Sequence, residues 1–285
     1  MRFPEFTEEW EETTLGKISE ITKGSGISKD QLSEQGSPCI LYGELYTKYK
    51  SEIIDEVYSR TELDSSSLVK SKANDVIIPC SGETAIDIST ARCVPFNNIL
   101  LGGDLNIIRL KHDDGGFFAY QLNGARKKDI ARVAQGVSVV HLYGENLKHI
   151  RVYHPAIEEQ KKITRLLSLI DERIATQNKI IEDLKKLKCA IIEKLYTEIQ
   201  GEEYSYGQLL EIVNERNKQM GYSNILSASQ EKGMVNREDL NLDIQFEHNN
   251  ISTYKIVREG DYVIHLRSFQ GGFAFSDKLG VCSPA

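Results

Sequence analysis

Cysteine is scarce in this chain of 285 residues, and its pattern excludes two kinds of stabilising site. The five cysteines are odd in number and widely scattered, and no two of them form a C-x-x-C pair. This spacing argues against a disulfide framework and against a structural zinc site. It is typical of a protein in a reducing compartment, so we expect a cytoplasmic location.

Long apolar runs are also missing. No stretch approaches the roughly 20 apolar residues that a membrane-spanning helix needs. The N-terminus reads Met1-Arg2-Phe3-Pro4-Glu5-Phe6 and continues with acids and a tryptophan, where a secretory signal would carry an apolar segment. The sequence therefore predicts no membrane partner.

Motifs for catalysis are absent as well. Neither phosphate-binding pattern, G-x-x-x-x-G-K-[ST] or G-x-G-x-x-G, occurs. The six histidines are dispersed, and none pairs with another at i, i+4 beside a glutamate, as a zinc hydrolase would require. Ser81-Gly82 lacks the G-x-S-x-G surround of a nucleophile elbow. We found no D-P-P-Y-like tetrad for methyl transfer and no nuclease pattern, so we expect a non-catalytic chain with no cofactor or metal of its own.

Positive charge is in deficit, with a formal net charge of −7 at pH 7. This total argues weakly against nucleic-acid binding, because contacts with phosphate need Lys and Arg. A net charge is an average, however, and a basic face can coexist with acidic faces elsewhere on the same protein. The total charge does not decide the question.

One stretch, from Ile157 to about Ile199, has an unmistakable pattern. Apolar residues recur at alternating steps of four and three, which is heptad spacing, and the seam is interrupted only by Gln177 and Lys188. Its positions are Ile163, Leu167, Ile170, Ile174, Ile181, Leu184, Ile191 and Leu195. Pro155 precedes the stretch and Gly201 ends it. About 43 residues make a rod of roughly 60 Å, which indicates a spacer or a dimerisation arm; the alternative is an ordinary core helix.

The first 155 residues predict a mixed, mostly β domain with several glycine-containing loops. Residues 39–60 alternate in the manner of strands, and residues 72–79 indicate a turn that leads into a buried strand. Further strands are expected at 92–94 and 106–110, and a short helix at 117–122. This segment is large enough to build a core of its own.

After the long helix the sequence begins to repeat. Leu15-Gly16-Lys17-Ile18-Ser19-Glu20-Ile21 has a counterpart in Tyr206-Gly207-Gln208-Leu209-Leu210-Glu211-Ile212, and 72–78 has one in 258–264. Cys93-Val94-Pro95 is echoed by Cys282-Ser283-Pro284. Three matches in the same order indicate a duplicated architecture. On this alignment Ala285 corresponds to Phe96, so the second copy has no equivalent of 97–155.

Two segments have residues suited to binding nucleic acid. Residues 124–138 combine a basic cluster with a polar loop flanked by glycine, and 267–273 offer an Arg, a Gln, two aromatic residues and a pair of glycines. Basic side chains can neutralise phosphates, while Gln or Ser on a projecting loop can reach base edges. The structural alternatives are a solvated helix face for the first segment and a hairpin turn for the second.

Several motifs resemble one known family. They are the run Gln135-Gly136-Val137-Ser138-Val139-Val140-His141-Leu142, then 147–150, Pro155 and Glu159-Gln160-Lys161-Lys162-Ile163, with 259–264 and 268–276 in the second copy. The chain resembles the DNA-specificity (S) subunit of Type I restriction-modification enzymes over essentially its whole length. The E-E-Q-x-x-I opening of a long helix after a proline is the most specific of these signatures.

The resemblance implies a fold and a set of partners. Such subunits carry two target-recognition domains, each of which reads one half of a split site in double-stranded DNA. Long helices set the distance between the halves and dock the methyltransferase (modification) subunits. Methylation and ATP-driven cleavage belong to the modification and the restriction/translocase subunits, so S-adenosylmethionine, ATP and Mg would be bound there and not here.

We therefore expect an α+β chain with three parts: a target-recognition domain at 1–155, a spacer helix at 156–200 and an incomplete second recognition domain at 201–285. The predicted DNA-binding residues are Lys23, Ser25, Ser81, Glu83, Thr84, Arg126, Lys127, Lys128, Arg132, Gln135, Ser138, Arg267 and Gln270. The predicted partner and helix-packing residues are Gln160 and the eight apolar seam positions given above.

The chain departs from the family pattern in length. With one complete domain, one helix and a partial second domain, we expect it to read one half-site, with a partial second half. Half-subunits of this family can pair through their helices, so a second half-subunit is a further expected partner; a shuffled or truncated gene product is the alternative. A different class of function, a non-catalytic cytoplasmic coiled-coil scaffold with a β-rich protein-binding domain, also fits the residues.

Overall fold

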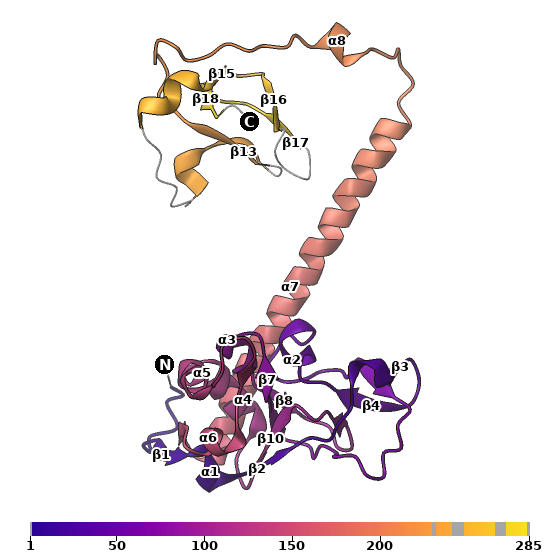
Figure 1. Ribbon diagram of the computed structural model, residues 1–285, viewed down its shortest axis with the longest axis vertical. Coiled ribbons are helices and arrows are strands. Elements are labelled where there is room, and N and C mark those ends of the chain that lie inside the picture. Colours follow the sequence, from indigo (N-terminus) through magenta and orange to yellow (C-terminus); the bar gives the residue numbers. More distant parts are fainter. Residues whose placement is uncertain (1, 230–231, 241–247, 266–271, 284–285) are drawn as a thin grey trace. The chain divides into compact units, whose positions relative to one another are not determined.

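The structure is a computed structural model that describes residues 2–229, 232–240, 248–265 and 272–283. The chain forms two compact units, Met1–Thr197 (unit 1) and Glu198–Ala285 (unit 2), and the long helix belongs to unit 1. Helices and short strands alternate in unit 1, which confirms the predicted α+β class (Figure 1). Among the described residues, no helix is both long enough and apolar enough to cross a membrane.

A four-stranded antiparallel sheet organises unit 1, in the order β2-β10-β6-β8. Its strands are β2 (Ser19–Lys23), β10 (Leu105–Leu110), β6 (Asp75–Pro79) and β8 (Arg92–Val94). All five residues of β6 are buried, because both faces of this sheet are covered. Such a strand is expected to carry a continuous apolar run, and Val76-Ile77-Ile78 is that run.

Smaller sheets and helices surround this one. A second sheet has the order β3-β5-β4-β9, and two pairs, β1-β12 and β11-β7, complete unit 1. These strands are β1 (Glu11–Thr14), β3 (Leu32–Ser33), β4 (Ser37–Ile40), β5 (Ser59–Thr61), β7 (Ser81–Gly82), β9 (Leu100–Leu101), β11 (Val140–His141) and β12 (Arg151–His154). The helices are α1 (Leu15–Ile18), η1 (Lys29–Gln31), α2 (Glu44–Thr47), α3 (Ala85–Ile88), α4 (Gly115–Asn123), α5 (Lys127–Val133), α6 (Gly144–Lys148) and α7 (Ile157–Thr197).

The β2-β10-β6-β8 sheet separates two hydrophobic cores. Val76 and Ile78 point into the first core, together with Phe117 and Phe118 of α4. Ile77, between them in sequence, points into the second core on the other face. This alternation follows from the two-residue repeat of a strand. The predicted strands at 92–94 and 106–110 and the helix at 117–122 are all confirmed, whereas the alternating stretch after Ile40 forms helix α2 instead of a strand.

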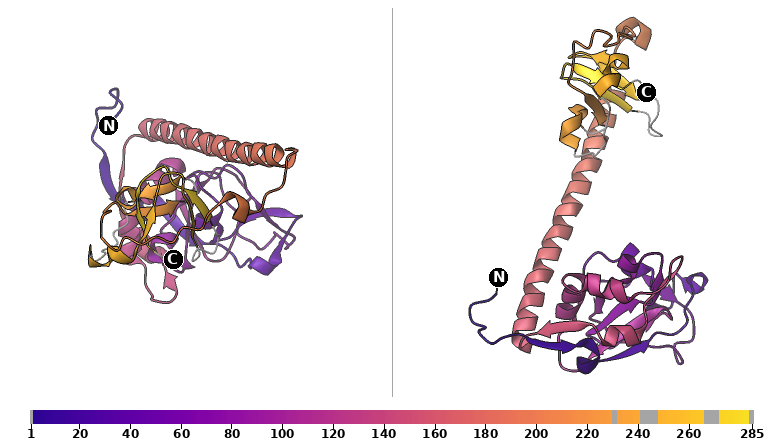
Figure 2. Two further views of the ribbon diagram at one scale, coloured as in Figure 1. Left: turned by 90° about the horizontal axis from the view of Figure 1, so that it is seen from above. Right: turned by 60° about the vertical axis from the view of Figure 1, so that its left-hand side comes forward.

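Helix α7 extends away from the rest of unit 1 (Figures 1 and 2). Its 41 residues make a rod of about 60 Å, and its first turns are fixed to the domain. Thr164 donates a hydrogen bond to Asp114, and Tyr120 donates one to Asp171 at 2.6 Å. Beyond Asp171 every residue of the helix is exposed within this chain.

The N-terminal segment lies across the root of α7. Arg2 forms a bidentate pair with Glu159, with both N···O distances at 2.7 Å, and Trp10 donates a third hydrogen bond to the same carboxylate. The Lys162 ammonium lies 4.7 Å from the centre of the Phe3 ring. These contacts join residues more than 140 positions apart, so the first ten residues help to hold the helix on its domain.

Unit 2 is built from short pairs of strands. Its elements are α8 (Tyr206–Leu209), β13 (Leu226–Ser229), β14 (Gly233–Asn236), η2 (Arg237–Leu240), η3 (His248–Thr253), β15 (Lys255–Val257), β16 (Tyr262–His265), β17 (Gly272–Phe275) and β18 (Gly280–Cys282). Among the described residues, β13 pairs with β14, β15 with β18 and β16 with β17. A small core contains Leu226, Val257 and Ala274.

The turn that leads into β6 recurs in unit 2, hydrogen bond by hydrogen bond. The Lys72 amide donates to the Asp75 carboxylate at 2.7 Å, and the Arg258 amide donates to Asp261 at 2.7 Å. Asn74 has φ 82° and donates its amide to Val94, while its counterpart Gly260 has φ 93° and donates to Ser276. Asparagine and glycine are the residues that adopt this left-handed conformation most readily.

The strand register extends this match. Val76 pairs with Cys93 in unit 1, and Tyr262 pairs with Phe275 in unit 2. The strand pair β16-β17 is therefore the counterpart of β6-β8. The predicted repeat is confirmed at this turn, and α1 and α8 both begin at the residues that the sequence match paired, Leu15 and Tyr206.

The third sequence match is wrong. Cys282 lies in β18, which pairs antiparallel with β15, and Val281 forms a parallel bridge with Ile225. In unit 1 this arrangement belongs to Leu100, which bridges Lys70 in antiparallel fashion and Cys39 in parallel fashion. The counterpart of β18 is thus β9, and the counterpart of Cys93 is Phe275. The similar letters around Cys93 and Cys282 do not reflect equivalent positions.

Candidate nucleic-acid interface

Three loops with predicted DNA-binding residues meet at one end of the β2-β10-β6-β8 sheet. They are the loops that contain Lys23, residues 81–84 and residues 135–138. Strand β2 ends at Lys23, β6 ends at Pro79 and β10 begins at Leu105, and these antiparallel strands place those ends together. Backbone hydrogen bonds connect the segments just beyond these strand ends. The amides of Gly24, Cys80 and Leu142 donate to the carbonyls of Leu105, Asp104 and Cys80, respectively. The fold therefore gathers segments that are far apart in the sequence.

Strands β7 and β11 present the most exposed of these loops. His141 pairs with Ser81 and Val140 with Gly82. Gln135 and His141 exchange both backbone hydrogen bonds, at 2.9 and 2.7 Å, which closes residues 136–140 into a tight loop. Gly136 turns this loop with φ 119°, and Val137 at its tip is 97% exposed. We name Lys23, residues 81–84 and residues 135–143 the β7–β11 edge.

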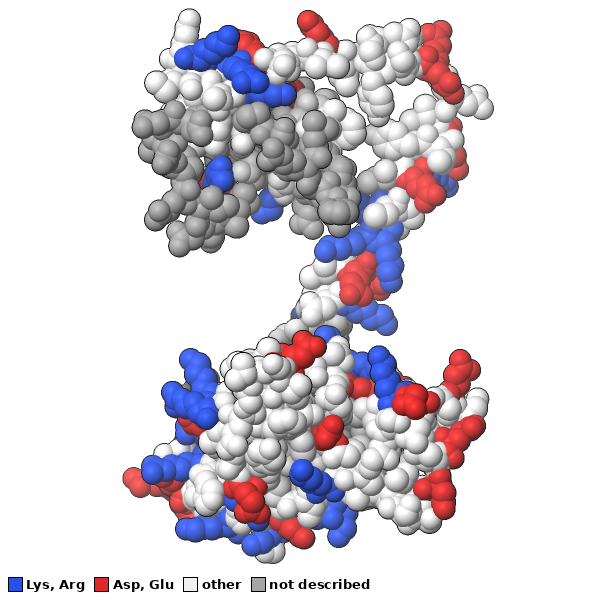
Figure 3. Space-filling model, in the orientation of Figure 1, with Lys and Arg blue, Asp and Glu red and all other residues white. Residues whose placement is uncertain are grey.

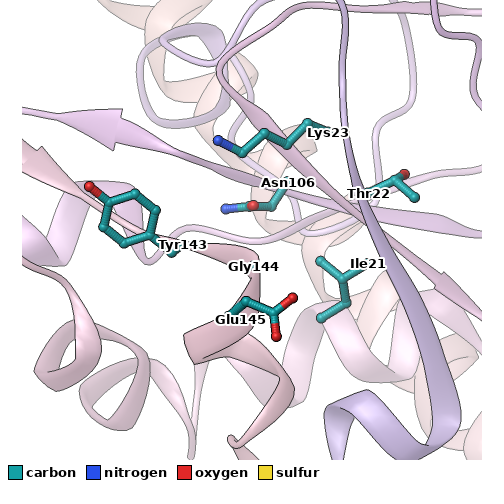
Figure 4. A pocket seen from close by; sticks show the side chains of 7 residues that line it. All are labelled: Ile21, Thr22, Lys23, Asn106, Tyr143, Gly144 and Glu145. Carbon is teal, nitrogen blue, oxygen red and sulfur yellow. The ribbon is translucent and has the colours of Figure 1, made fainter.

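A cavity of about 340 Å³ opens beside this edge, lined by Ile21, Thr22, Lys23, Asn106, Tyr143, Gly144 and Glu145. Figure 4 shows the Asn106 amide between the Lys23 and Tyr143 side chains. Asn106 is fully buried and donates to the Leu142 carbonyl at 2.9 Å, while its Oδ1 has no hydrogen-bond partner among the described residues. The cavity thus combines a cation, an aromatic ring and a buried acceptor.

The Lys23 ammonium acts on the neighbouring thiol. Burial raises the pKa of Cys80 to about 11, and the positive charge of Lys23 opposes that rise. Cys80 is therefore a neutral core side chain at physiological pH and not a nucleophile.

The basic cluster lies on α5, next to the edge, because α5 packs on α3. Asp129 divides this cluster. Its carboxylate accepts hydrogen bonds from Arg126 at 3.2 Å and from Arg132 at 3.0 Å. Arg126 also lies over the Tyr153 ring, 5.5 Å from its centre. Lys128 and Arg132 are exposed, and Arg132 keeps 76% of its side chain in solvent.

Charge is distributed unevenly over unit 1. Figure 3 shows Lys and Arg gathered over the α5 side, and Asp and Glu gathered over the region of β3 and β4. The exposed acids of that second region include Asp30, Glu34, Glu62 and Asp64. A polyanion would therefore be attracted to the α5 side and repelled from the β3–β4 side.

Some predicted contact residues serve the fold of the domain. The Ser25 hydroxyl accepts the Val69 amide at 2.8 Å, and Thr84 caps α3 by accepting the Asp87 amide. Arg126 is half-buried and engaged as described. Lys23, Glu83, Lys128, Arg132, Gln135 and Ser138 are exposed, while Ser81 and Lys127 are half-buried. Arg267 and Gln270 lie outside the described residues.

Gln160 corrects the prediction of a partner contact. It is 1% exposed, and its amide is used within unit 1: it accepts from the Asp114 backbone and donates to Asp113 and the Pro155 carbonyl. Ile163 packs against the first core for the same reason, because both residues belong to the root of α7. The other seam positions from Ile170 to Leu195 are between 47% and 60% exposed.

The sequence reading also missed residues. His141 and Tyr143 are exposed at the β7–β11 edge, with rings stacked 6.2 Å apart. Further exposed apolar residues widen the stripe of α7 beyond the heptad seam, namely Leu166, Leu169, Ile180, Leu187, Ile192 and Tyr196. A search for helical i, i+3, i+4 spacing would have found them.

Residues 7–186 match the family model described as the Type I restriction modification DNA specificity domain. This chain belongs to that family. The match covers most of unit 1, including the β7–β11 edge and much of α7. The β7–β11 edge is thus part of a specificity domain.

Curated relatives share the assignment. The Type I restriction enzyme MjaVIII specificity subunit of Methanocaldococcus jannaschii is 25% identical over 194 residues, which cover 67% of this chain and 42% of that protein. The chain spans less than half the length of the curated relatives that it matches.

Solved structures of the same kind also match. An S subunit of a Type I restriction-modification system from M. genitalium aligns with a TM-score of 0.48 and 19% identity, over 66% of this chain and 46% of that one. The HsdS subunit from Thermoanaerobacter tengcongensis aligns with a TM-score of 0.43 and 16% identity, over 67% of this chain and 46% of that one.

Proposed function

We propose that this specificity domain binds double-stranded DNA in a sequence-dependent manner through the β7–β11 edge and the adjacent α5. Membership of the DNA specificity family is the observation that carries the proposal. The geometry supports it, because the fold brings a projecting loop that carries Gln135 and Ser138, an exposed pair of stacked rings and exposed cations to one side of unit 1.

The two parts of this surface would have different roles. Lys128 and Arg132 on α5 are suited to phosphate contacts, which give affinity and orientation but little sequence information. Gln135 and Ser138, on the loop closed by the Gln135–His141 pair, are suited to base edges in the major groove. The acidic β3–β4 side would face away from the duplex.

Selection from a randomised duplex library, followed by titration at several salt concentrations, tests this proposal with the full chain. We expect Lys128→Glu with Arg132→Glu to weaken binding to all sequences alike and to reduce the salt slope by about 2. We expect Gln135→Ala to relax the preference at one base pair, by about 1–3 kcal/mol.

Lys17→Glu with Lys111→Glu is the matched control, because both lysines are exposed and lie beyond the Ser19–Leu110 end of the β2–β10 pair, opposite to Lys23. This double variant should leave binding unchanged. Equal losses for the control and the α5 variant, or no DNA binding by the parent chain, would contradict the proposal.

We further infer that the chain acts as a non-catalytic specificity subunit, reading one half of a bipartite site, with a partial contribution from unit 2. The exposed apolar stripe of α7 would receive a partner: a modification subunit or a second half-subunit, with a restriction/translocase subunit joining the complex. S-adenosylmethionine, ATP and Mg would then be bound by those subunits. Support comes from the stripe itself, since an apolar surface of this length is unusual on a free protein.

Light scattering of the full chain and of an Ile181→Lys, Leu184→Lys variant tests this part. We expect the parent to form dimers or to bind a co-purified modification subunit, and the variant to lose both. A parent chain that stays monomeric and ignores the modification subunit would count against it.

A further inference from the structure

The described part of unit 2 contains the counterpart of one of the two cores of unit 1. By the register of the repeated turn and strands, Leu226, Val263 and Cys282 correspond to Ile40, Ile77 and Leu101. All three unit 1 residues belong to the second core, and all three unit 2 residues belong to or pack against the small core of unit 2. This side of the β16-β17 pair therefore packs against a hydrophobic core, as the same side of β6-β8 does.

The side chains on the other side of the same strand pair are exposed. Tyr262, Ile264, Phe273 and Phe275 are 55%, 53%, 57% and 48% exposed, and we name these four residues the open face. Their unit 1 counterparts are Val76, Ile78, Ala91 and Cys93, which are at most 4% exposed in the first core. The same position in the fold is thus a core in one unit and a surface in the other.

Unit 1 shows what covers such a face. Helix α4 packs on β6 and β8, and its Phe117 and Phe118 fill the first core. Gly115, at its start, lies so close that a Cβ there would sit 3.0 Å from the Cys93 sulfur. Removing apolar surface of this kind from water stabilises a domain.

Helix α8 already approaches the open face as α1 approaches the first core. Leu15 of α1 is fully buried there, and its counterpart Tyr206 stacks on Phe273 with ring centres 6.2 Å apart. Tyr206 nevertheless remains 73% exposed. The open face therefore has the same arrangement of apolar residues as one half of the first core.

An edge for strand pairing lies beside it. In unit 1, β6 pairs with β8 on one edge and with β10 on the other. Among the described residues, β16 pairs only with β17, the counterpart of β8. No described residue of unit 2 pairs at the edge that β10 occupies in unit 1, and such an edge readily accepts an added strand.

We infer that unit 2 receives a segment from outside residues 1–285 that has a β-strand followed by an apolar helix. The strand pairs with Tyr262–His265, as β10 pairs with β6, and the helix covers the open face, as α4 covers the first core. This inference does not depend on the proposed DNA binding.

The chemistry favours this occupant over a second copy of the chain. A second copy has one strand and helix of this kind, β10 and α4, and both are already committed to its own first core. Three of the four residues of the open face are also larger than their counterparts, while Ile264 is the same residue type as Ile78. At equal packing density the incoming helix would therefore carry side chains smaller than the Phe117-Phe118 pair.

Two synthetic peptides test the inference on the full chain. One has the sequence of residues 103–124, and the other has the same sequence with Phe117→Ala and Phe118→Ala. Hydrogen exchange is followed at the amides of β16 and β17. We expect at least one peptide to slow exchange there about tenfold at saturation, since paired amides open less often, with little change in β15 and β18.

Variants distinguish binding at the open face from nonspecific hydrophobic binding of the peptides. Phe273→Ser with Phe275→Ser should abolish the protection, while Leu279→Ser, an exposed apolar residue next to β18, should retain it. Three results would overturn the inference: no protection by either peptide, equal protection in the double-serine variant, or protection that rises with protein concentration in the absence of peptide. The last would show that a second copy covers the face.

Discussion

The strand pairs β6-β8 and β16-β17 have the same backbone and opposite surroundings. Both follow a turn closed by an Asp carboxylate on the amide three residues earlier, and both have a left-handed residue before that Asp. One pair is buried on both faces, whereas the other is buried on one. Local hydrogen bonds therefore define the motif, while the rest of the domain decides how much each side chain contributes to stability.

The largest expected difference concerns the first core. Phe118 is fully buried, so Phe118→Ala should lower the free energy of unfolding of unit 1 by about 3–5 kcal/mol. Phe275→Ala, at the half-exposed open face of unit 2, should cost about 1 kcal/mol in the absence of a partner, through its ring contact with the paired Tyr262. Urea unfolding followed by Trp10 fluorescence reports on unit 1, because Trp10 packs on Phe117, and hydrogen exchange at the amides of β16 and β17 reports on unit 2. A large cost for Phe275→Ala would mean that the face is already covered.

A smaller difference is expected at the turn carboxylates. Asp75 is buried and accepts from Lys72 and, through two bonds at 2.8 and 2.7 Å, from Arg109, whose pKa this contact raises. Because Arg109 is part-exposed, Asp75→Asn should cost about 2 kcal/mol, less than for a fully buried pair. Asp261→Asn disturbs only the local turn and should cost about 0.5–1 kcal/mol. Equal midpoint shifts in urea would contradict this ranking.

How far the sequence could predict these structures depends on the range of the interactions. The heptad spacing was sufficient for α7, and the run Val76-Ile77-Ile78 was sufficient for β6, because both signals are local. The equivalence of β18 with β9 could not be read from letters, since it depends on pairing with Lys255 and Ile225 across long loops. The similar residues around Cys93 and Cys282 led instead to a match between positions that are not equivalent in the fold.

The candidate interface shows the same limit. The basic cluster and the Gly136 loop are local features and were found from the sequence. That Asp129 engages both Arg126 and Arg132, and that Gln160 is turned into the domain, depends on side-chain contacts that spacing does not encode. Tyr143 was missed because a lone exposed tyrosine carries no periodic signal.

The left-handed residues of the two turns give a third test. The Asn74 side chain donates to the Asp113 carbonyl and accepts the Gly115 amide, so it anchors the start of α4. Asn74→Gly keeps the backbone conformation but loses these bonds, and it should cost about 1–2 kcal/mol. Gly260→Asn has open space around its Cβ but takes on the strain of φ 93°, which Asn tolerates better than other residues with a Cβ, so it should cost less than about 1 kcal/mol. A neutral Asn74→Gly would show that α4 is held by its apolar contacts alone.

The smallest effect is expected at two ion pairs and depends on pH. Hydrogen bonds from Arg2 lower the pKa of the Glu159 carboxyl, which is buried at the root of α7, whereas Glu215 and Arg258 form an exposed pair in unit 2. Because the folded pKa of Glu159 is lowered, its contribution is fully present above the unfolded value of about 4.3 and is lost as pH falls through the folded value. Between pH 7 and pH 3 we therefore expect the amides of residues 2–10 to lose protection from hydrogen exchange, beyond the intrinsic change in exchange rate.

In Glu159→Gln these amides should be less protected already at pH 7 and should show little further loss, while Glu215→Gln should behave like the parent. Loss of protection that is the same in Glu159→Gln and the parent would show that another group holds the N-terminal segment against α7.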